Sequence, residues 1–238
     1  MIPSLTKQEL LSLVRERHQE VRAFLDWAAK TERSWSLRLA RRPDIRMAGE
    51  AAELFPEDWW GVVVFSCFGS LKGTRAVASH FQQPLPTGLA EEVLTQVSFP
   101  SPSIGHHRTQ QGLTGATIAL AGASGKAGLF HTTLHSELDF DDRFDAIWAQ
   151  RPPRWGRTTI FDVLLRAGAL GIGGCQVLPT SAYLSGSTGP ARGFHKVFGG
   201  TGANNERAAW AEAVLRAWTG NWVEVTELVV HPIARCAG

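Results

Sequence analysis

The chain has 238 residues, of which 44% are hydrophobic and 19% charged, with a formal net charge of +2. These values are ordinary for a globular protein and exclude a disordered chain. The three cysteines, Cys67, Cys175 and Cys236, form no CxxC pair, so we expect reduced thiols rather than disulfides or a zinc knuckle. The N-terminus lacks a secretory pattern, and the longest apolar run, 61–68, is too short to span a bilayer. We therefore expect a cytoplasmic protein with no membrane partner.

Apolar spacing predicts a mostly helical chain. Thr6 and Glu9 form a capping box ahead of an apolar pattern at helical spacing, which predicts a helix over 7–31. The run 59–68 fits either a strand or a buried helix, and 228–230 fits a short strand or a frayed end. Further helices are predicted over 33–41, 45–55, 89–97, 115–123, 158–169 and 205–218. We predict a single globular domain over 1–238, mostly α with at most a minor β element.

Charge is unevenly distributed in the second half of the chain. The segment 137–145 holds five acids and one base, whereas 151–200 holds six basic residues and one acid, Asp162. A carboxylate cluster beside a basic, glycine-rich region is typical of an enzyme that acts on a polyanion. The alternative is a solvated acidic loop beside a basic helix face.

Familiar catalytic motifs fail on inspection. The run GASGKAG at 122–128 lacks the first glycine and the Ser/Thr of a Walker phosphate loop, and Lys126 interrupts the G-x-S-x-G of a hydrolase elbow. His131 and His135 lie four residues apart, but two histidines without a surrounding HExxH are weak grounds for a metal site. We expect neither a metal nor a cofactor.

The segment 155–200 carries the strongest functional signal. An apolar helix there runs into Gly-Ala-Leu-Gly-Ile-Gly-Gly at 168–174. This pattern resembles the hairpin of helix-hairpin-helix proteins, which implies backbone contacts from Gly171, Gly173 and Gly174 to DNA phosphates. The alternative is a glycine-rich turn that merely lets two helices pack. The side chains expected to add phosphate contacts, several of them in the later run SGSTGPARG, are Arg157, Arg166, Ser187, Thr188, Arg192 and Lys196.

The order of hairpin and glycine-rich loop resembles the helix-hairpin-helix superfamily of DNA glycosylases, where a catalytic aspartate follows the hairpin. No aspartate follows Asp162 in this chain, so the catalytic aspartate of those glycosylases has no matching position here. The runs WGRTTIFD and RAGALG are similar to a divergent branch: the alpha-glutamyl/putrescinyl thymine pyrophosphorylases and anti-phage glycosylases of hypermodified bases. The resemblance implies a helical fold, base flipping and a partner that is double-stranded DNA carrying a modified base. No obligate protein partner is expected.

Removing a base from deoxyribose calls for a carboxylate near the sugar and a pocket for the flipped base. Asp162 is the leading carboxylate because it is the only acid of the basic stretch; the alternative is an aspartate salt-bridged to Arg157 or Arg166. A second group of candidates comprises Glu137, Asp139 and Asp142, since crowded carboxylates favour a perturbed pKa. The side chains expected to stack on or hydrogen-bond the base are Trp148, Trp155, Phe161, Tyr183 and Asn204.

These features predict a DNA N-glycosylase that flips a modified base and hydrolyses its N-glycosidic bond. The first alternative is a transferase that attaches a group to an activated pyrimidine in DNA, which would need a second substrate pocket. The others are a non-catalytic DNA-binding protein and an enzyme of small molecules. Lys196, near the glycine-rich loop, leaves an accompanying lyase activity open.

Overall fold

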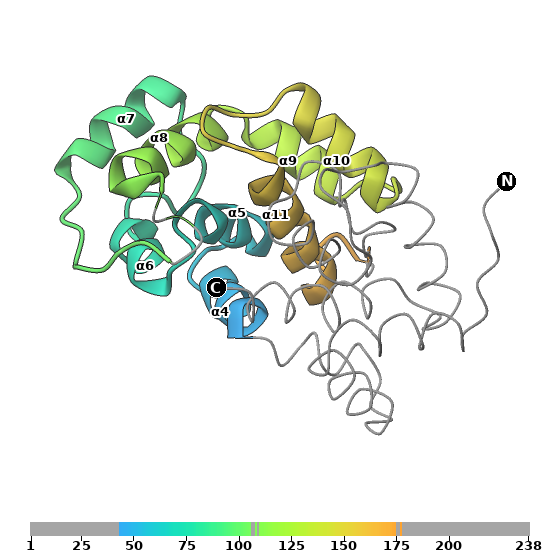
Figure 1. Cartoon of the computed structure of the whole chain (residues 1–238), viewed down its shortest axis with the longest axis horizontal. Coiled ribbons are helices and arrows are strands. Elements are labelled where there is room, and N and C mark those ends of the chain that lie inside the picture. Colours follow the sequence, from blue (N-terminus) through green and yellow to red (C-terminus); the bar gives the residue numbers. More distant parts are fainter. Residues whose placement is uncertain (1–42, 106–107, 109, 175–176, 178–238) are drawn as a thin grey trace, which may run out of the picture. The chain divides into compact units, whose positions relative to one another are not determined.

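The computed structural model describes residues 43–105, 108, 110–174 and 177. This part of the chain contains eight α-helices, labelled α4 to α11 (Figure 1), and Arg108 lies in a 3₁₀ turn before α8. The prediction of a mostly α-helical protein is therefore confirmed. None of the described helices is long and apolar enough to cross a membrane.

Some predictions fall outside the described residues. They are the helices over 7–31, 33–41 and 205–218 and the short element at 228–230. The single domain over 1–238 likewise stays a prediction.

The helices are α4 (Pro43–Ala52), α5 (Asp58–Phe68), α6 (Leu71–Ala78), α7 (Thr87–Gln96), α8 (Gly112–Ser124), α9 (Ala127–Leu134), α10 (Phe140–Ala149) and α11 (Arg157–Leu170). The predicted helices over 45–55, 89–97, 115–123 and 158–169 correspond to α4, α7, α8 and α11, with ends that differ by a few residues. The sequence patterns did not predict α6, α9 or α10.

Helix α5 is the centre of the described fold. Its residues from Trp59 to Phe68 are all buried, and it packs against α4, α6, α8, α9 and α11 (Figure 1). The segment that fitted either a strand or a helix is thus a buried helix, which needs no polar face because every side is covered. Gly69 ends the helix in the left-handed conformation at φ 64°, with its N–H bonded to the carbonyl of Phe65.

Helix α4 packs closely against α5. Pro43 is the first residue of α4 in the described part of the chain. Gly61 of α5 makes the close approach possible, because a Cβ there would lie 2.6 Å from the Cα of Ala52. The contact holds α5 in place for the polar side chain it carries near its end, Ser66.

The acidic segment begins α10 rather than forming a loop. The carboxylate of Asp139 accepts a hydrogen bond of 2.9 Å from the backbone N–H of Asp142, which is a helix N-cap. Asp141 and Asp142 lie in the first turn, where the helix dipole favours negative charge. The acids thus have a local role in starting the helix.

Helix α11 ends in a Schellman motif at the glycine-rich pattern. Gly171 has φ 71°, its N–H bonds to the carbonyl of Gly168, and the N–H of Ile172 bonds to that of Ala167. Ile172 is buried. The alternation of glycine with apolar residues therefore has a structural explanation in the helix end.

Candidate functional site

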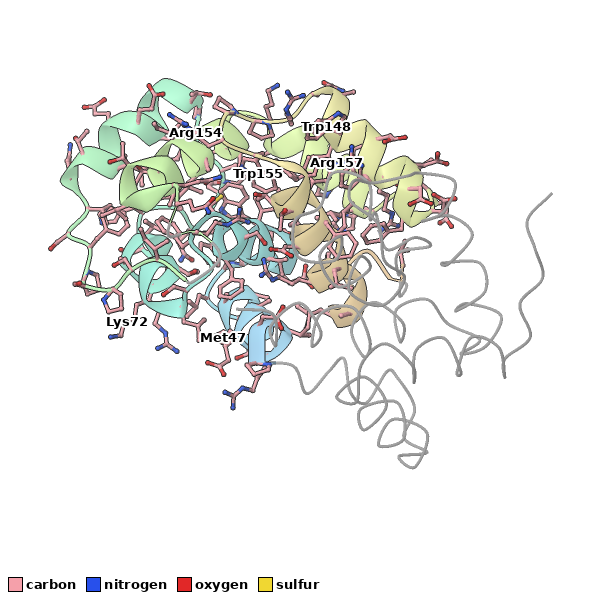
Figure 2. The ribbon with its side chains drawn as sticks, viewed as in Figure 1. Met47, Lys72, Trp148, Arg154, Trp155 and Arg157 are labelled. Atoms are coloured by element: carbon pink, nitrogen blue, oxygen red, sulfur yellow. The ribbon has the colours of Figure 1, made fainter. Side chains whose placement is uncertain are left out.

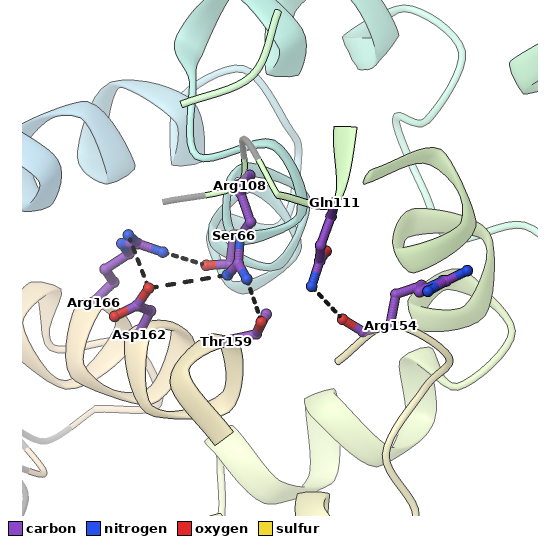
Figure 3. A network of polar contacts seen from close by, with 7 residues as sticks. All are labelled: Ser66, Arg108, Gln111, Arg154, Thr159, Asp162 and Arg166. Atoms are coloured by element: carbon purple, nitrogen blue, oxygen red, sulfur yellow. Dashed lines mark hydrogen bonds and ion pairs between the residues drawn. The ribbon is translucent and has the colours of Figure 1, made fainter. Parts of the chain in front are cut away.

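One face of α11 carries a buried polar cluster. Thr159, Asp162 and Arg166 are spaced three and four residues apart, so their side chains project from the same face of the helix. Ser66 of α5 and Arg108, from the segment before α8, complete the group (Figure 3). We call these five residues the arginine cluster.

Arg166 connects α11 to α5. Its Nη2 lies 3.7 Å from the Oδ2 of Asp162, and its Nη1 donates a hydrogen bond of 3.0 Å to the hydroxyl of Ser66. Its guanidinium carbon also lies 5.0 Å from the ring centre of Phe65, within the range of a cation–π contact. The predicted alternative that Asp162 pairs with Arg166 is confirmed.

Arg108 approaches the same carboxylate from the other side. Its Nη1 donates to the hydroxyl of Thr159, and its Nη2 lies 4.0 Å from the Oδ2 of Asp162 (Figure 3). Burial lowers the pKa of the Arg108 guanidinium, and the charge of Asp162 opposes that shift. One carboxylate oxygen thus faces two guanidinium groups.

The cluster holds more positive than negative charge. Two guanidiniums and one carboxylate sum to +1, while the side chains of Arg108 and Arg166 are only 6% and 5% exposed. Among the described residues, the Nη2 of Arg108 and the Nε of Arg166 are buried without a hydrogen-bond partner. Buried cations with unused donors cost folding free energy, so the arrangement suits an anion that takes up both the charge and the donors.

Cys67 lies beside the cluster. Burial raises the pKa of its thiol from an ordinary value near 9 to about 12, although Arg108 and Trp155 oppose the shift. The thiol therefore stays protonated at neutral pH, which disfavours a role as a nucleophile.

The remaining predicted carboxylates are not joined to the cluster. Glu137, Asp139 and Asp142 are exposed and lie at or just before the start of α10. No ion pair or hydrogen bond given by the described residues connects them with Asp162. Their catalytic role stays a prediction, whereas Asp162 has charged neighbours that bear directly on chemistry.

The glycines predicted to hold phosphate are largely occupied. The N–H groups of Gly171 and Gly174 already donate to carbonyls of the chain. A Cβ on Gly173 would lie 2.1 Å from the carbonyl oxygen of Leu134, so this glycine allows close packing against the end of α9. The phosphate contacts of these glycines stay a prediction, and the described geometry favours the packing alternative.

The predicted aromatic residues differ in burial. Trp155 is in the core, where its indole N–H donates to the carbonyl of Ala119 at 3.1 Å. Phe161 is half-buried against Phe140, with ring centres 5.5 Å apart. Trp148 is half-buried at the end of α10. Of these rings, Trp155 has its polar atom satisfied within the fold, which favours a packing role.

The two arginines predicted to contact phosphate on α11 differ in burial. Arg157, the first residue of α11, is exposed and stacks over Phe144 and Trp148. Arg166 is buried, so it can meet a phosphate only as part of the arginine cluster. The remaining predicted site residues lie outside the described part of the chain: Tyr183, Ser187, Thr188, Arg192, Lys196 and Asn204.

The sequence reasoning did not predict the roles of Arg108, Ser66 and Thr159. Arg108 belongs to a His-His-Arg triplet in a stretch without acids, but nothing local connects it with Asp162, which is far along the chain. Ser66 had a weaker signal: it is a polar residue inside the otherwise apolar run of α5. A buried hydroxyl in such a run needs a partner, and Arg166 supplies it.

Comparison with known proteins gives the family. The searches of curated proteins and of solved structures find no match. Residues 107–232, just over half of the 238, match the sequence profile of alpha-glutamyl/putrescinyl thymine pyrophosphorylase clade 3. The matched region includes Arg108, Asp162 and Arg166. The resemblance to the pyrophosphorylases is therefore confirmed, and the resemblance to glycosylases stays a prediction. The chain belongs to the alpha-glutamyl/putrescinyl thymine pyrophosphorylase clade 3 family.

Proposed function

We propose that this protein is a DNA-modifying transferase that replaces a pyrophosphate group on a thymine-derived base with an amine. The family name describes glutamyl- and putrescinyl-thymine together with pyrophosphate chemistry. In the proposed step the amine nitrogen forms a bond to the methylene carbon attached to C5 of the base. The bond between that carbon and oxygen breaks, its electron pair leaves with the pyrophosphate, and the amine proton passes to water.

The arginine cluster is the observation that carries this proposal. Its net charge of +1 and its two unused donors, the Nη2 of Arg108 and the Nε of Arg166, suit a group that brings negative charge and several oxygens. A pyrophosphate has negative charge and several oxygens, and guanidinium groups bind phosphate oxygens through charge-assisted hydrogen bonds. Donors fixed before the reaction stabilise the charge that grows on a leaving group.

Access to the cluster is from the side of Asp162. Its side chain is 22% exposed, whereas those of Arg108 and Arg166 are nearly covered. In this proposal Asp162 is a positioning residue, because its Oδ2 holds both guanidiniums toward a common point. The hydroxyls of Ser66 and Thr159 fix the far ends of the same two groups.

The test uses DNA that contains a pyrophosphorylated 5-hydroxymethyluracil. The protein is incubated with this DNA and with glutamate or putrescine, and bases are identified by mass spectrometry while released pyrophosphate is measured. We expect the aminated base and one pyrophosphate per base. Arg108→Gln should lower turnover by about 100- to 1,000-fold, the usual cost of a lost transition-state donor. Full activity in Arg108→Gln would show that the arginine cluster does not take part in the reaction.

An N-glycosylase is the second candidate, favoured by the partial exposure of Asp162. A carboxylate that solvent reaches at one edge of a cationic cluster could face the sugar of a flipped nucleotide. The same incubation separates the two reactions, because a glycosylase releases the free base and leaves alkali-labile abasic sites. In that case Asp162→Asn should abolish turnover and leave DNA binding intact. Abasic sites without an aminated base would show that the protein is a glycosylase and not a transferase.

A further inference from the structure

The loop that connects α10 to α11 carries exposed cations around a tryptophan. Arg151, Arg154 and Arg157 are all exposed, and no acid lies between residues 150 and 161. Lys126, at the turn between α8 and α9, is bonded to this loop through its Nζ, which donates to the carbonyl of Gln150 at 2.5 Å. Together with Trp148 these four cations form what we call the Trp148 patch. Figure 2 labels Trp148 and Arg157 next to each other, and Arg154 farther along the upper part of the described helices.

Two guanidiniums of the patch are held against aromatic rings. Arg151 lies 4.2 Å from the ring centre of Trp148, and Arg157 lies 5.6 Å from the same ring and 5.3 Å from that of Phe144. Stacking orders these side chains. The Nη1 of Arg151 also donates to the carbonyl of Trp148 at 3.4 Å, and other N–H donors at the rim of each guanidinium can meet a ligand. Arg157 has no hydrogen bond or ion pair within the described part of the chain.

The loop is fastened to α8 along its length. The Nε2 of Gln111 donates to the carbonyl of Arg154 at 3.1 Å, and the indole of Trp155 donates to the carbonyl of Ala119. A Cβ on Gly122 would lie 2.6 Å from the Cδ of Pro153, so the helix and loop are in close contact. The cations of the patch are therefore presented by a constrained backbone.

Arg154 adds a conformational observation. Among the described residues, Arg154 is a non-glycine residue with a positive φ, at 63°. This left-handed conformation costs about 1–2 kcal/mol for a residue with a side chain. Its side chain is exposed and forms no ion pair with a described carboxylate. The conformation belongs to a β-turn, in which the N–H of Trp155 donates to the carbonyl of Pro152 at 3.2 Å. The turn leaves the charged side chain of Arg154 on the surface, where a ligand can reach it.

We infer that the Trp148 patch binds the phosphate backbone of the DNA substrate, an inference that rests on the proposed function. A stacked, planar guanidinium presents parallel N–H donors that can bind two oxygens of one phosphate, and unpaired cations release counterions when they meet DNA. The acids of α10 lie mainly in and before its first turn, whereas the patch lies at the C-terminal end of the helix. The acids are therefore far enough along the helix to leave the patch positively charged.

The test is fluorescence anisotropy of a labelled DNA duplex, measured against salt concentration. The variant Arg151→Gln/Arg154→Gln/Arg157→Gln removes three charges and keeps the side-chain stems. We expect its plot of log K against log salt to be flatter by about 2–3, because each lost phosphate contact contributes about 0.9. Affinity at low salt should fall by tenfold or more.

The matched control removes the same charge elsewhere. Arg46, Lys72 and Arg75 are exposed cations of α4 and α6. Figure 2 shows Lys72 at the lower margin of the described helices and Trp148 and Arg154 in their upper part. Arg46→Gln/Lys72→Gln/Arg75→Gln should change the salt slope little. An equal loss in both triple variants would overturn the inference, as would wild-type binding by the patch variant. Competition by polyglutamate as strong as by DNA would also overturn it, because the patch would then bind acidic polypeptides.

Turnover separates this inference from the proposed function. If the patch variant binds DNA like wild type while the wild type aminates its base, the patch assignment fails and the function stands. If binding depends on the patch but no amination occurs, the function fails and the DNA surface stands.

Discussion

Arg157 and Arg166 lie on the same helix but in opposite environments. Arg157, at the start of α11, is exposed and stacked on Trp148 and Phe144 with no ion pair among the described residues. Arg166, nine residues later, is buried, paired with Asp162 and bonded to Ser66. Sequence pattern treated both as phosphate contacts. Their burial assigns them different roles. Arg157 belongs to a surface that can bind a polyanion reversibly, and Arg166 belongs to a site where an anion would accept hydrogen bonds from buried donors that have no acceptor.

The comparison has an energetic side. An exposed guanidinium keeps its hydration and contributes to stability weakly, so it can be removed with little effect on folding. The buried pair of Arg108 and Arg166 depends on Asp162 for its single compensating charge. Changes in the arginine cluster should therefore alter both folding and ligand binding, whereas neutralising an exposed arginine of the Trp148 patch should alter mainly DNA binding.

The largest expected effect on stability is that of Asp162→Asn. This change leaves two buried guanidiniums facing each other without an anion, and we expect the free energy of unfolding to fall by about 2–4 kcal/mol. Adding pyrophosphate should restore more stability to this variant than to wild type, because its cluster has a net charge of +2. Denaturant unfolding with and without pyrophosphate measures both.

Asp145→Asn is the matched control, because Asp145 is an exposed acid of α10. Its effect should stay within about 0.5 kcal/mol. A loss in Asp162→Asn no larger than in this control would show that Asp162 does not balance the two arginines.

Alkaline pH gives the next effect, through Cys67. Its pKa is raised in the folded state to about 12 from an ordinary value near 9. Above pH 9 the unfolded chain loses the thiol proton while the folded chain keeps it, so stability falls as pH rises from about 9 to about 12. Between about pH 8 and about pH 10 the loss from this group should be about 1.4 kcal/mol.

Comparison with Cys67→Ala isolates that contribution. The difference in unfolding free energy between wild type and the variant should shrink over this interval. A difference that stays constant with pH would show that the thiol is not held protonated by burial.

The smallest effect is expected in the patch. Arg154→Gly relieves a positive φ, so we expect the free energy of unfolding to rise by about 0.5–1 kcal/mol. DNA affinity should fall in the same variant, since a phosphate contact is lost. Anisotropy and unfolding measured on one preparation give both values, and a stabilised variant with full DNA affinity would leave Arg154 without a role in the patch.

Local patterns predicted the helices well where apolar spacing was regular. Helices α4, α7, α8 and α11 were predicted from their own residues, and the run 59–68 was recognised as buried but not assigned, since a continuous apolar segment has no period that separates helix from strand. Helix α10 was not predicted because its acids were interpreted as a functional carboxylate cluster, with a solvated loop as the alternative. The capping role of Asp139 depends on a local hydrogen bond that the charge count alone does not reveal.

The site could be predicted only in part. Asp162 and Arg166 are four residues apart, so their pairing was one of the alternatives that the sequence left open. Ser66 and Arg108 are distant from α11 in the chain. Ser66 meets Arg166 because α5 and α11 pack together. Arg108 meets Asp162 because its segment is bonded to the end of α5 through the N–H of Gly105 and the carbonyl of Phe68. The glycines after Leu170 suggested a DNA hairpin, but three of the amides from 171 to 174 are used within the helix end and the turn after it.

Calorimetric titration with pyrophosphate tests the central claim most directly. The wild type should bind pyrophosphate, Arg108→Met and Arg166→Met should each lose most of that affinity, and the triple glutamine variant of the Trp148 patch should keep it. Arg166→Met leaves the Arg108–Asp162 pair balanced in charge, so its loss of binding is not expected to come from unfolding. Retained binding in both methionine variants together with loss in the patch variant would contradict the account, because the exposed arginines and not the buried ones would then hold the anion.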